Sequence, residues 1–357
     1  MTAVTLPTLA TDKFYINGAW VDPLRGGVIA VENPATETSI AEVPAGTAAD
    51  IDAAVAAAKA AFPTFSRTSK AERLELLAAI REVYVRKRTE MARLITAELG
   101  APLSLSKGAQ TAVGVGHLDG FVKALEALEF ESINAQGDLL VKEPIGVVGL
   151  ITPWNWPINQ IALKILAAIA TGCTSVLKPS ELTPLNAILY MDILHEAGVP
   201  AGVVNMVHGT GPEVGVALSA HPDVAMVSFT GSTRAGREIT RDAAETIKRV
   251  TLELGGKSPN ILLPDADLEP SVSRGVRHVM MNTGQSCNAP TRMLVQKDSY
   301  AQAVDIATAT AAKVEVGDPQ DAGRHIGPLV SGAQWQWRCP RPGRNCLSEQ
   351  ASAWGRC

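Results

Sequence analysis

Apolar and polar residues follow a helical period through the first third of the chain. Ser69 and Glu72 have the spacing of a capping box, in which two side chains satisfy the free N–H groups at a helix start. This box opens an amphipathic stretch over residues 71–99, which Gly100 ends. A shorter, alanine-rich stretch before it begins with a first capping box, in which Thr47 is the N-cap and Asp50 lies three residues on. We therefore expect two N-terminal scaffold helices.

Two flanking stretches complete this part of the pattern. Residues 14–21 read as a short extended segment, within which Asn17-Gly18 predicts a type I′ turn. Residues 105–130 read as a helix that three glycines interrupt, and we attribute them to close packing. These glycines are Gly108, Gly114 and Gly116.

Short apolar runs alternate with helical stretches from Pro144 onward, and the helices end at glycines such as Gly172 and Gly198. This is βαβ repetition, which predicts a parallel sheet with helices on its faces. Ligands bind beyond the carboxyl ends of such strands, so we expect a nucleotide site there. The expected strands are residues 145–151, 174–177, 203–207, 224–229 and 249–254.

A second mixed pattern follows, with strands expected at 260–263 and 291–296 and helices at 268–282 and near 300–314. One cysteine, Cys287, falls on the helix-to-strand turn between them. A reactive thiol needs partial exposure and polar neighbours, whereas a structural cysteine usually sits inside an apolar run. Taken alone, the position still favours an ordinary loop cysteine.

Composition narrows the class of protein. An apolar content of 46% is ordinary for a core-forming globular chain, and 357 residues exceed one average domain. A formal net charge of −4 without a Lys/Arg-rich block argues against a nucleic-acid partner. The N-terminus has no signal pattern, and no apolar run suits a membrane span, so we expect a cytoplasmic location. Cys173 and Cys287 lack metal-type spacing, so we expect neither a disulfide nor a metal.

Five short motifs change the interpretation of Cys287, and together they are highly specific. They are PWNWP at 153–157, KPSE at 178–181, FTGS at 229–232, ELGGKSP at 253–259 and GQSC at 284–287. In this order they resemble the aldehyde dehydrogenase superfamily, over residues 13–334.

The resemblance implies an α/β fold of two parts. Residues 1–254 would form a Rossmann-like, parallel-sheet NAD-binding domain, with an oligomerisation strand region near 131–145. Residues 255–333 would form the first part of an incomplete α/β catalytic domain. The resemblance also implies a small-molecule aldehyde as substrate and, in the full-length family, a homo-oligomer.

The expected cofactor is NAD. The loop GSTRAG at 231–236 lies between a strand and a helix, where glycines let the backbone approach phosphates, although packing alone also produces such turns. It matches the family's NAD loop, in which Ser232 would contact a phosphate. The Glu181 carboxylate can accept both ribose hydroxyls but would repel a 2′-phosphate, which favours NAD over NADP. A helix-capping role for Ser180 and Glu181 is the alternative.

The full set of expected cofactor contacts lies at strand ends and in the loops that follow them. They are Ile151, Thr152, Pro153, Trp154, Lys178, Ser180, Glu181, Gly211, Pro212, Gly215, Phe229, Thr230, Gly231, Ser232, Gly236 and Leu254.

Three residues are candidates for the chemistry of aldehyde oxidation. Cys287 would form a tetrahedral thiol adduct that can release a hydride. The Asn155 amide, with the Cys287 N–H, would stabilise the oxyanion, and Glu253 would activate the water that hydrolyses the thioester. The simpler alternatives are a turn-forming asparagine and a strand-end salt bridge. Two alternatives remain for the function of the chain. It is either a CoA-acylating aldehyde dehydrogenase or a non-catalytic, truncated fragment that retains nucleotide binding.

The C-terminal end departs from the family pattern. The family continues through a motif whose glutamate holds the nicotinamide ribose and through an oligomerisation strand, and neither is present. Residues 334–357 lack hydrophobic periodicity, so we expect an unstructured, out-of-frame tail. A metal or redox tail built on Cys339, Cys346 and Cys357 is the alternative. Without the downstream glutamate we expect the chain as written to be inactive or nearly so.

Overall fold

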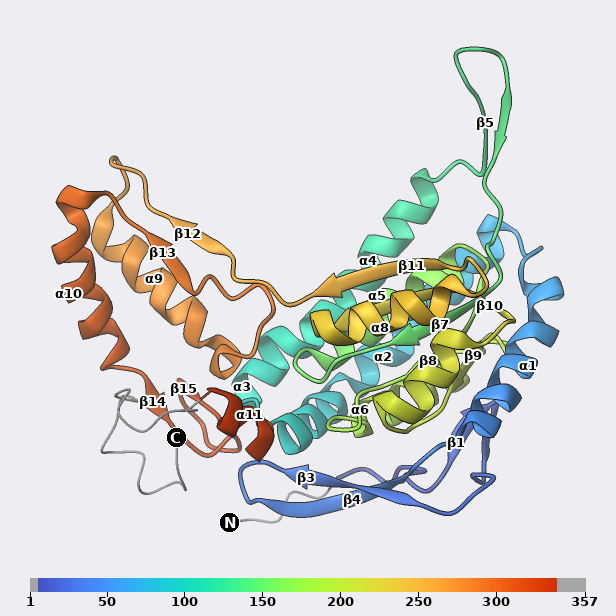
Figure 1. Cartoon of the computed structure of the whole chain (residues 1–357), viewed down its shortest axis with the longest axis horizontal. Helices are drawn as coiled ribbons and strands as arrows, with labels where there is room; N and C mark the ends of the chain where they lie inside the picture. Colours follow the sequence, from blue (N-terminus) through green and yellow to red (C-terminus); the bar gives the residue numbers. More distant parts are fainter. Residues whose placement is uncertain (1–5, 339–357) are drawn as a thin grey trace.

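The computed structural model describes residues 6–338 of the chain. A seven-stranded sheet lies at its centre, with the strand order β11-β10-β7-β8-β9-β1-β2 (Figure 1). The five strands from β11 to β9 are parallel, as the βαβ pattern predicts, and the hairpin β1–β2 adds two antiparallel strands at one edge. The sheet strands are β1 (Phe14–Ile16), β2 (Ala19–Val21), β7 (Val147–Ile151), β8 (Thr174–Lys178), β9 (Val204–Met206), β10 (Val224–Gly231) and β11 (Arg249–Leu254).

Helices cover both faces of this sheet. On one face α5 and α6 pack, with α2 and α4 as a further layer behind them; on the other lie α1, α7 and α8. Adjacent residues of β7 point to opposite faces of the sheet. Val148 packs in an apolar core with residues of α5 and α6, whereas Val147 packs in a second apolar core with residues of α1 and α7. These helices are α1 (Ala48–Phe65), α2 (Lys70–Leu99), α4 (Thr111–Ala127), α5 (Pro157–Ala170), α6 (Leu185–Glu196), α7 (Val216–Ala220) and α8 (Thr233–Ala244).

The predicted helix starts are confirmed. Both capping boxes form, at Thr47 and at Ser69, and α2 ends at Gly100, whose φ of 79° is left-handed. Asn17 (φ 54°) and Gly18 (φ 76°) both have positive φ between β1 and β2, as a type I′ turn requires. Local turn and cap chemistry therefore decides these boundaries.

The helix expected at 105–130 is divided. It consists of α3 (Leu103–Leu105), the π-helical turn η1 (Ser106–Gln110) and α4. Close packing explains Gly114, because a Cβ there would lie 2.3 Å from the Tyr84 hydroxyl. It is the wrong explanation for Gly108 and Gly116, around which a Cβ would meet nothing within 4 Å.

Two hairpins stand apart from the sheet. β3 (Val28–Asn33) pairs with β4 (Thr38–Pro44), and β5 (Glu131–Ile133) pairs with β6 (Leu139–Val141). The second hairpin projects away from the rest of the molecule in Figure 1 and exposes Ile133, Leu139 and Val141. It coincides with the region 131–145 that was expected to serve oligomerisation.

Beyond β11 the chain leaves the sheet and builds a second group of elements (Figure 1). Here β12 and β13 form a parallel pair, and α9 packs against α10. The assignment of this group to a separate catalytic domain beginning at 255 stays a prediction. Its elements are β12 (Pro259–Ile261), α9 (Leu268–Met280), η3 (Met281–Gly284), β13 (Arg292–Leu294), η4 (Lys297–Ser299) and α10 (Tyr300–Ala311).

The last described segment returns to the first part of the molecule. The Leu103 N–H donates to the Pro319 carbonyl at 2.8 Å, and Val330 belongs to the same buried core as α2 and α5. The segment holds β14 (Glu315–Val316), β15 (His325–Ile326) and α11 (Gly332–Arg338). The expectation of an unstructured tail from Gln334 is thus wrong for residues 334–338, because Ser331 accepts hydrogen bonds from the first turn of α11. Residues 339–357, with the three tail cysteines, lie outside the described residues.

Candidate active site

Cys287 lies on an exposed turn that the backbone holds in an unusual conformation. Three successive residues before it, Asn282 (φ 54°), Thr283 (φ 57°) and Gly284 (φ 70°), are left-handed. This conformation costs a residue with a side chain roughly 1–2 kcal/mol, so neighbouring contacts must hold Asn282 and Thr283 in place. The exposure of Cys287 agrees with the position of a reactive thiol.

A cleft of about 220 Å³ opens beside this cysteine. It brings Asn155, Glu253 and Cys287 together from three segments that are far apart in the sequence. The walls come from the loop after β7, the end of β10, the end of β11 with its two glycines, and the cysteine turn. The lining residues are Pro153, Trp154, Asn155, Thr230, Gly231, Ser232, Glu253, Leu254, Gly255, Gly256, Lys257, Gln285, Ser286 and Cys287.

Glu253 reaches the cleft because of the alternation along β11. Val250, Leu252 and Leu254 are partly buried, while Thr251 and Glu253 are exposed. The sequence predicted this orientation, since side chains of a strand point to opposite faces in turn. The carboxylate is therefore available to a molecule in the cleft.

Asn155 is held by its own amide group. Its Nδ2 donates to the Gln285 carbonyl at 2.8 Å, two residues before Cys287. Next to it, Trp156 Nε1 donates to Ser286 Oγ at 2.8 Å. Two side chains of the loop after β7 are thus tied to the cysteine turn.

The remaining expected cofactor residues do not line this cleft but continue along the same sheet edge. Ile151 is in register with Lys178 on one side and with Phe229 on the other, and Thr152 follows directly. Gly211, Pro212 and Gly215 form the turn η2 (Gly211–Gly215) after β9, and Gly236 lies in the first turn of α8 against Leu254.

Lys178 and Glu181 form a partly buried ion pair. Lys178 is 3% exposed, and its Nζ lies 2.9 Å from the Glu181 carboxylate and donates also to the Pro179 carbonyl. Burial lowers the pKa of Lys178, and the Glu181 charge opposes that shift. The pair leaves the half-exposed carboxylate of Glu181 at the sheet edge, where a hydroxyl group of a ligand can approach.

The helix-capping alternative for Ser180 and Glu181 is wrong. At the start of α6 the N–H groups of Leu185 and Asn186 donate to Glu98, at 2.6 and 2.9 Å. Burial raises the pKa of Glu98 to about 7. A residue from the end of α2 therefore caps this helix, and no local sequence signal indicated it.

Two hydroxyl groups at the sheet edge are buried without a partner. Among the described residues, Thr152 Oγ1 and Thr230 Oγ1 make no hydrogen bond, although these threonines are only 4% and 6% exposed. Buried polar groups are normally satisfied, so such a pair is typical of a site that binds a polar ligand. Thr152 directly follows β7, and Thr230 lies near the end of the neighbouring strand β10, directly before the expected NAD loop.

Ser232 is the N-cap of α8, and its Oγ accepts a hydrogen bond from the Ala235 N–H at 3.2 Å. A helix N-terminus carries a partial positive charge and free N–H groups, which favour an anion such as a phosphate. Gly231 makes room for the Phe229 ring, because a Cβ at this position would lie 2.5 Å from it.

Sequence reasoning missed four residues of this region. Lys164, in the apolar helix α5, is 7% exposed and donates to Ser228 Oγ. An isolated lysine in an apolar helix was a signal that could have identified it. Gln110, Asn282 and Gln285, all at most 3% exposed, hold the cysteine turn. These three residues are recognised as part of the site only from their hydrogen bonds to residues far away in the sequence.

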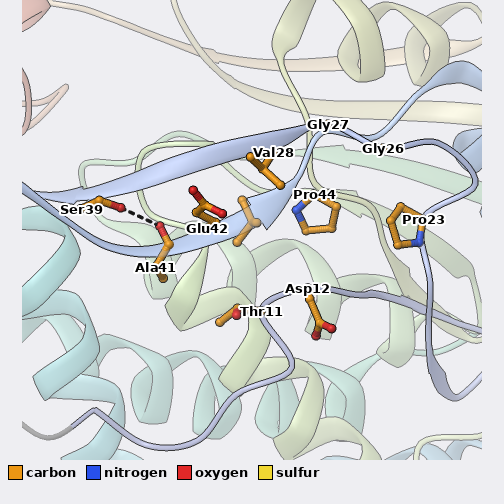
Figure 2. Close-up of a pocket in the computed structure, with 11 residues that line it drawn as sticks. Thr11, Asp12, Pro23, Gly26, Gly27, Val28, Ser39, Ala41, Glu42 and Pro44 are labelled. Atoms are coloured by element: carbon orange, nitrogen blue, oxygen red, sulfur yellow. Dashed lines mark hydrogen bonds between the residues drawn. The ribbon is translucent and has the colours of Figure 1, made fainter.

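A larger hollow, of about 550 Å³, lies elsewhere, between the β3–β4 hairpin and the N-terminal segment (Figure 2). Among the described residues that line it, only Asp12 and Glu42 are charged, and none carries a thiol. In the described part of the chain no group of three or more histidine, cysteine or acidic side chains suits a metal ion. The cleft beside Cys287 is therefore the site with the groups for covalent chemistry.

Comparisons with known proteins agree with this arrangement. The profile described as "Aldehyde dehydrogenase family" matches residues 20–338. A 3-succinoylsemialdehyde-pyridine dehydrogenase of a Pseudomonas species is 50% identical over 325 residues, which cover 91% of this chain and 68% of that protein. A putative aldehyde dehydrogenase of Staphylococcus epidermidis is 45% identical, with 90% and 68% covered. The chain thus spans about two thirds of these relatives.

Solved structures give the same result. The crystal structure of an aldehyde dehydrogenase from Bartonella henselae superposes with a TM-score of 0.90 at 48% identity, covering 92% of this chain and 70% of that one. A cysteine-to-alanine mutant of aldehyde dehydrogenase C from Pseudomonas syringae, in complex with NAD+ and octanal, gives 0.91 at 47% identity, covering 94% and 69%. No helix among residues 6–338 is long and apolar enough to cross a membrane.

Proposed function

Because this chain belongs to the aldehyde dehydrogenase family, we propose that its cleft oxidises an aldehyde to a carboxylic acid with NAD, through a covalent adduct on Cys287. One observation carries the proposal: Asn155, Glu253 and Cys287 line a single cleft. A thiol, an amide donor and a carboxylate are the groups that this reaction requires.

NAD fits the residues at the edge of the sheet. The free hydroxyls of Thr152 and Thr230 and the N-terminus of α8 are suited to polar and anionic groups, and Glu181 is suited to ribose hydroxyls. The other contacts are those expected from the motifs. When bound, NAD+ supplies a nicotinamide ring that accepts a hydride.

The residues of the cleft divide the reaction between them. The Cys287 sulfur forms a bond to the aldehyde carbon, and the carbonyl oxygen becomes an oxyanion. The second N–H of the Asn155 amide and the Cys287 N–H stabilise that oxygen, each by about 3 kcal/mol. Loss of a hydride leaves a thioester on Cys287. Glu253 removes a proton from the water that attacks the thioester, which releases the acid and restores the thiol.

The test is NADH formation at 340 nm with NAD+ and a panel of aldehydes, measured on a version of the chain extended to the length of the relatives of which it spans about two thirds, because little or no turnover is expected of the chain as written. Cys287→Ala should abolish it, because no other thiol of the described residues lines the cleft. Cys173→Ala is the matched control, since Cys173 is buried at the start of β8. Turnover by the Cys287 variant at the rate of the parent chain would exclude the covalent mechanism.

We propose further that the β5–β6 hairpin serves contact between copies of the chain, in the cytoplasm. Ile133 (66% exposed), Leu139 (58%) and Val141 (52%) form an apolar edge that two copies could cover by pairing. Leu139→Lys with Val141→Lys should reduce the mass measured by analytical ultracentrifugation. Ala135→Lys with Gln136→Lys, in the exposed turn of the same hairpin, is the control that adds the same two charges. An unchanged mass in the double variant would exclude this contact.

A further inference from the structure

Three amide side chains around the cysteine turn form a closed ring of hydrogen bonds. Asn155 Nδ2 donates to the Gln285 carbonyl at 2.8 Å, Gln285 Nε2 donates to the Asn282 carbonyl at 3.1 Å, and Asn282 Nδ2 donates to the Asn155 carbonyl at 2.8 Å. Each side chain therefore fixes the main chain of the next. Because every acceptor is a main-chain carbonyl, only the NH₂ end of each amide can face it.

Two members of the ring are buried, and the ring is supported from outside. Asn282 and Gln285 are 2% and 3% exposed. Gln110, at the end of the π-helical turn η1, is fully buried and reaches both the Asn155 carbonyl (3.2 Å) and Asn282 Oδ1 (3.4 Å). The Val330 N–H donates to Gln285 Oε1 at 3.0 Å. Breaking one member leaves buried polar groups of the others unsatisfied, so the three act as a unit.

Resting on the proposed role of Asn155 as an oxyanion donor, we propose that Asn282 and Gln285 are positioning residues, which direct the Asn155 amide toward the atoms bonded to Cys287. One Asn155 N–H is used by the ring, which leaves the other for the cleft. The ring joins the loop after β7 to the cysteine turn two residues before Cys287. The distance between donor and nucleophile is thus set by the ring.

The left-handed turn explains why Asn282 occupies this place. Asparagine tolerates a positive φ better than other residues with side chains, because its short amide can bond locally. Here the amide bonds instead to Asn155, 127 positions earlier in the chain. Glycine would keep the left-handed backbone and delete only the amide, which makes Asn282→Gly a specific test of the ring.

The test measures adduct formation without NAD, so turnover is not needed. Iodoacetamide alkylates Cys287, peptide mass spectrometry separates it from the other cysteines, and propanal should protect it by forming the thiohemiacetal. Asn155→Ala and Asn282→Gly should each raise the half-protecting propanal concentration roughly tenfold, the effect of one lost hydrogen bond of about 1.4 kcal/mol. Gln285→Met should act in the same direction.

Thr283→Gly is the matched control, because Thr283 has the same left-handed backbone but its hydroxyl donates to the Gly327 carbonyl outside the ring. It should change protection less than about twofold. The double variant Asn155→Ala/Asn282→Gly should be no worse than Asn155→Ala, since Asn282 acts through Asn155. If the effects of the two substitutions multiply in the double variant, the proposal is overturned. It is also overturned if propanal protects Cys287 in Asn282→Gly as well as it does in the parent chain.

Hydrogen exchange separates failure of the ring from failure of the proposed function. If propanal does not protect Cys287 even in the parent chain, the proposed function fails, and the ring is judged by exchange alone. Asn282→Gly should then increase amide exchange in both 152–156 and 283–288, whereas Thr283→Gly should increase it only in 283–288. Unchanged exchange over 152–156 in Asn282→Gly refutes the ring.

Discussion

Lys164 Nζ donates a hydrogen bond to Ser228 Oγ at 2.8 Å, from the middle of the apolar helix α5 to strand β10. The lysine is 7% exposed, and burial lowers its pKa to about 8, against the opposing charge of Glu253. A cation is therefore held beneath the wall of the cleft that carries the proposed general base. The free-energy cost of burying the protonated Lys164 therefore depends on pH.

This relationship predicts how stability changes in alkali. The pKa of Lys164 is about 8 in the folded chain and has the ordinary lysine value of 10.5 in the unfolded chain, so between these values the unfolded chain binds more protons. The contribution of Lys164 to the free energy of unfolding must then rise with pH, by about 2 kcal/mol from pH 7 to pH 9.5. Lys164→Met should lose this dependence and be more stable than the parent at pH 7.

Urea unfolding of the parent chain and Lys164→Met at pH 7 and pH 9.5 measures this effect. Lys313→Met, at an exposed lysine after α10, is the control and should behave like the parent at both pH values. If the stability difference between Lys164→Met and the parent is the same at both pH values, Lys164 has an ordinary pKa in the fold.

Glu253→Gln should separate the two halves of the reaction. The amide keeps the shape of the side chain but cannot remove a proton from water, so thioester hydrolysis should slow by about a hundredfold or more. In the version of the chain extended to the length of its relatives, stopped-flow absorbance should show a stoichiometric NADH burst followed by slow turnover.

The exposed Glu245, after α8, provides the matched variant Glu245→Gln, which should leave both phases unchanged. An equal loss of burst and steady rates in Glu253→Gln would instead assign Glu253 to activating the Cys287 thiol.

Two glycines of α4 should respond in opposite ways to alanine. A Cβ at Gly114 would lie 2.3 Å from the Tyr84 hydroxyl, which donates to the Thr111 carbonyl at 2.9 Å, and Tyr84 is fully buried. Gly114→Ala should therefore destabilise the chain by about 1–3 kcal/mol. Gly116→Ala has open space and should stabilise it by about 0.5–1 kcal/mol through helix propensity.

Thermal unfolding of the two alanine variants beside the parent chain is sufficient to check this pair. Equal shifts of the melting temperature in the same direction would show that packing against Tyr84 does not determine the choice of glycine at 114.

The sequence by itself determined the local elements and most of the candidate site. Capping boxes at Thr47 and Ser69 and the Asn17-Gly18 turn specify their boundaries through contacts within a few residues. The βαβ pattern specified the parallel sheet. The motifs identified Asn155, Glu253 and Cys287 as candidates, because special backbone and special chemistry require particular residue types at fixed spacing.

Tertiary structure decided which side chains meet. Glu98 caps α6 from the end of α2, and Gly114 but not Gly116 touches Tyr84. The amide ring joins Asn155 to Asn282, 127 positions away, and no local pattern contains that pairing. The physical reason is range: a cap or turn is satisfied within one turn of chain, whereas a buried polar group takes whichever partner the packed fold brings to it.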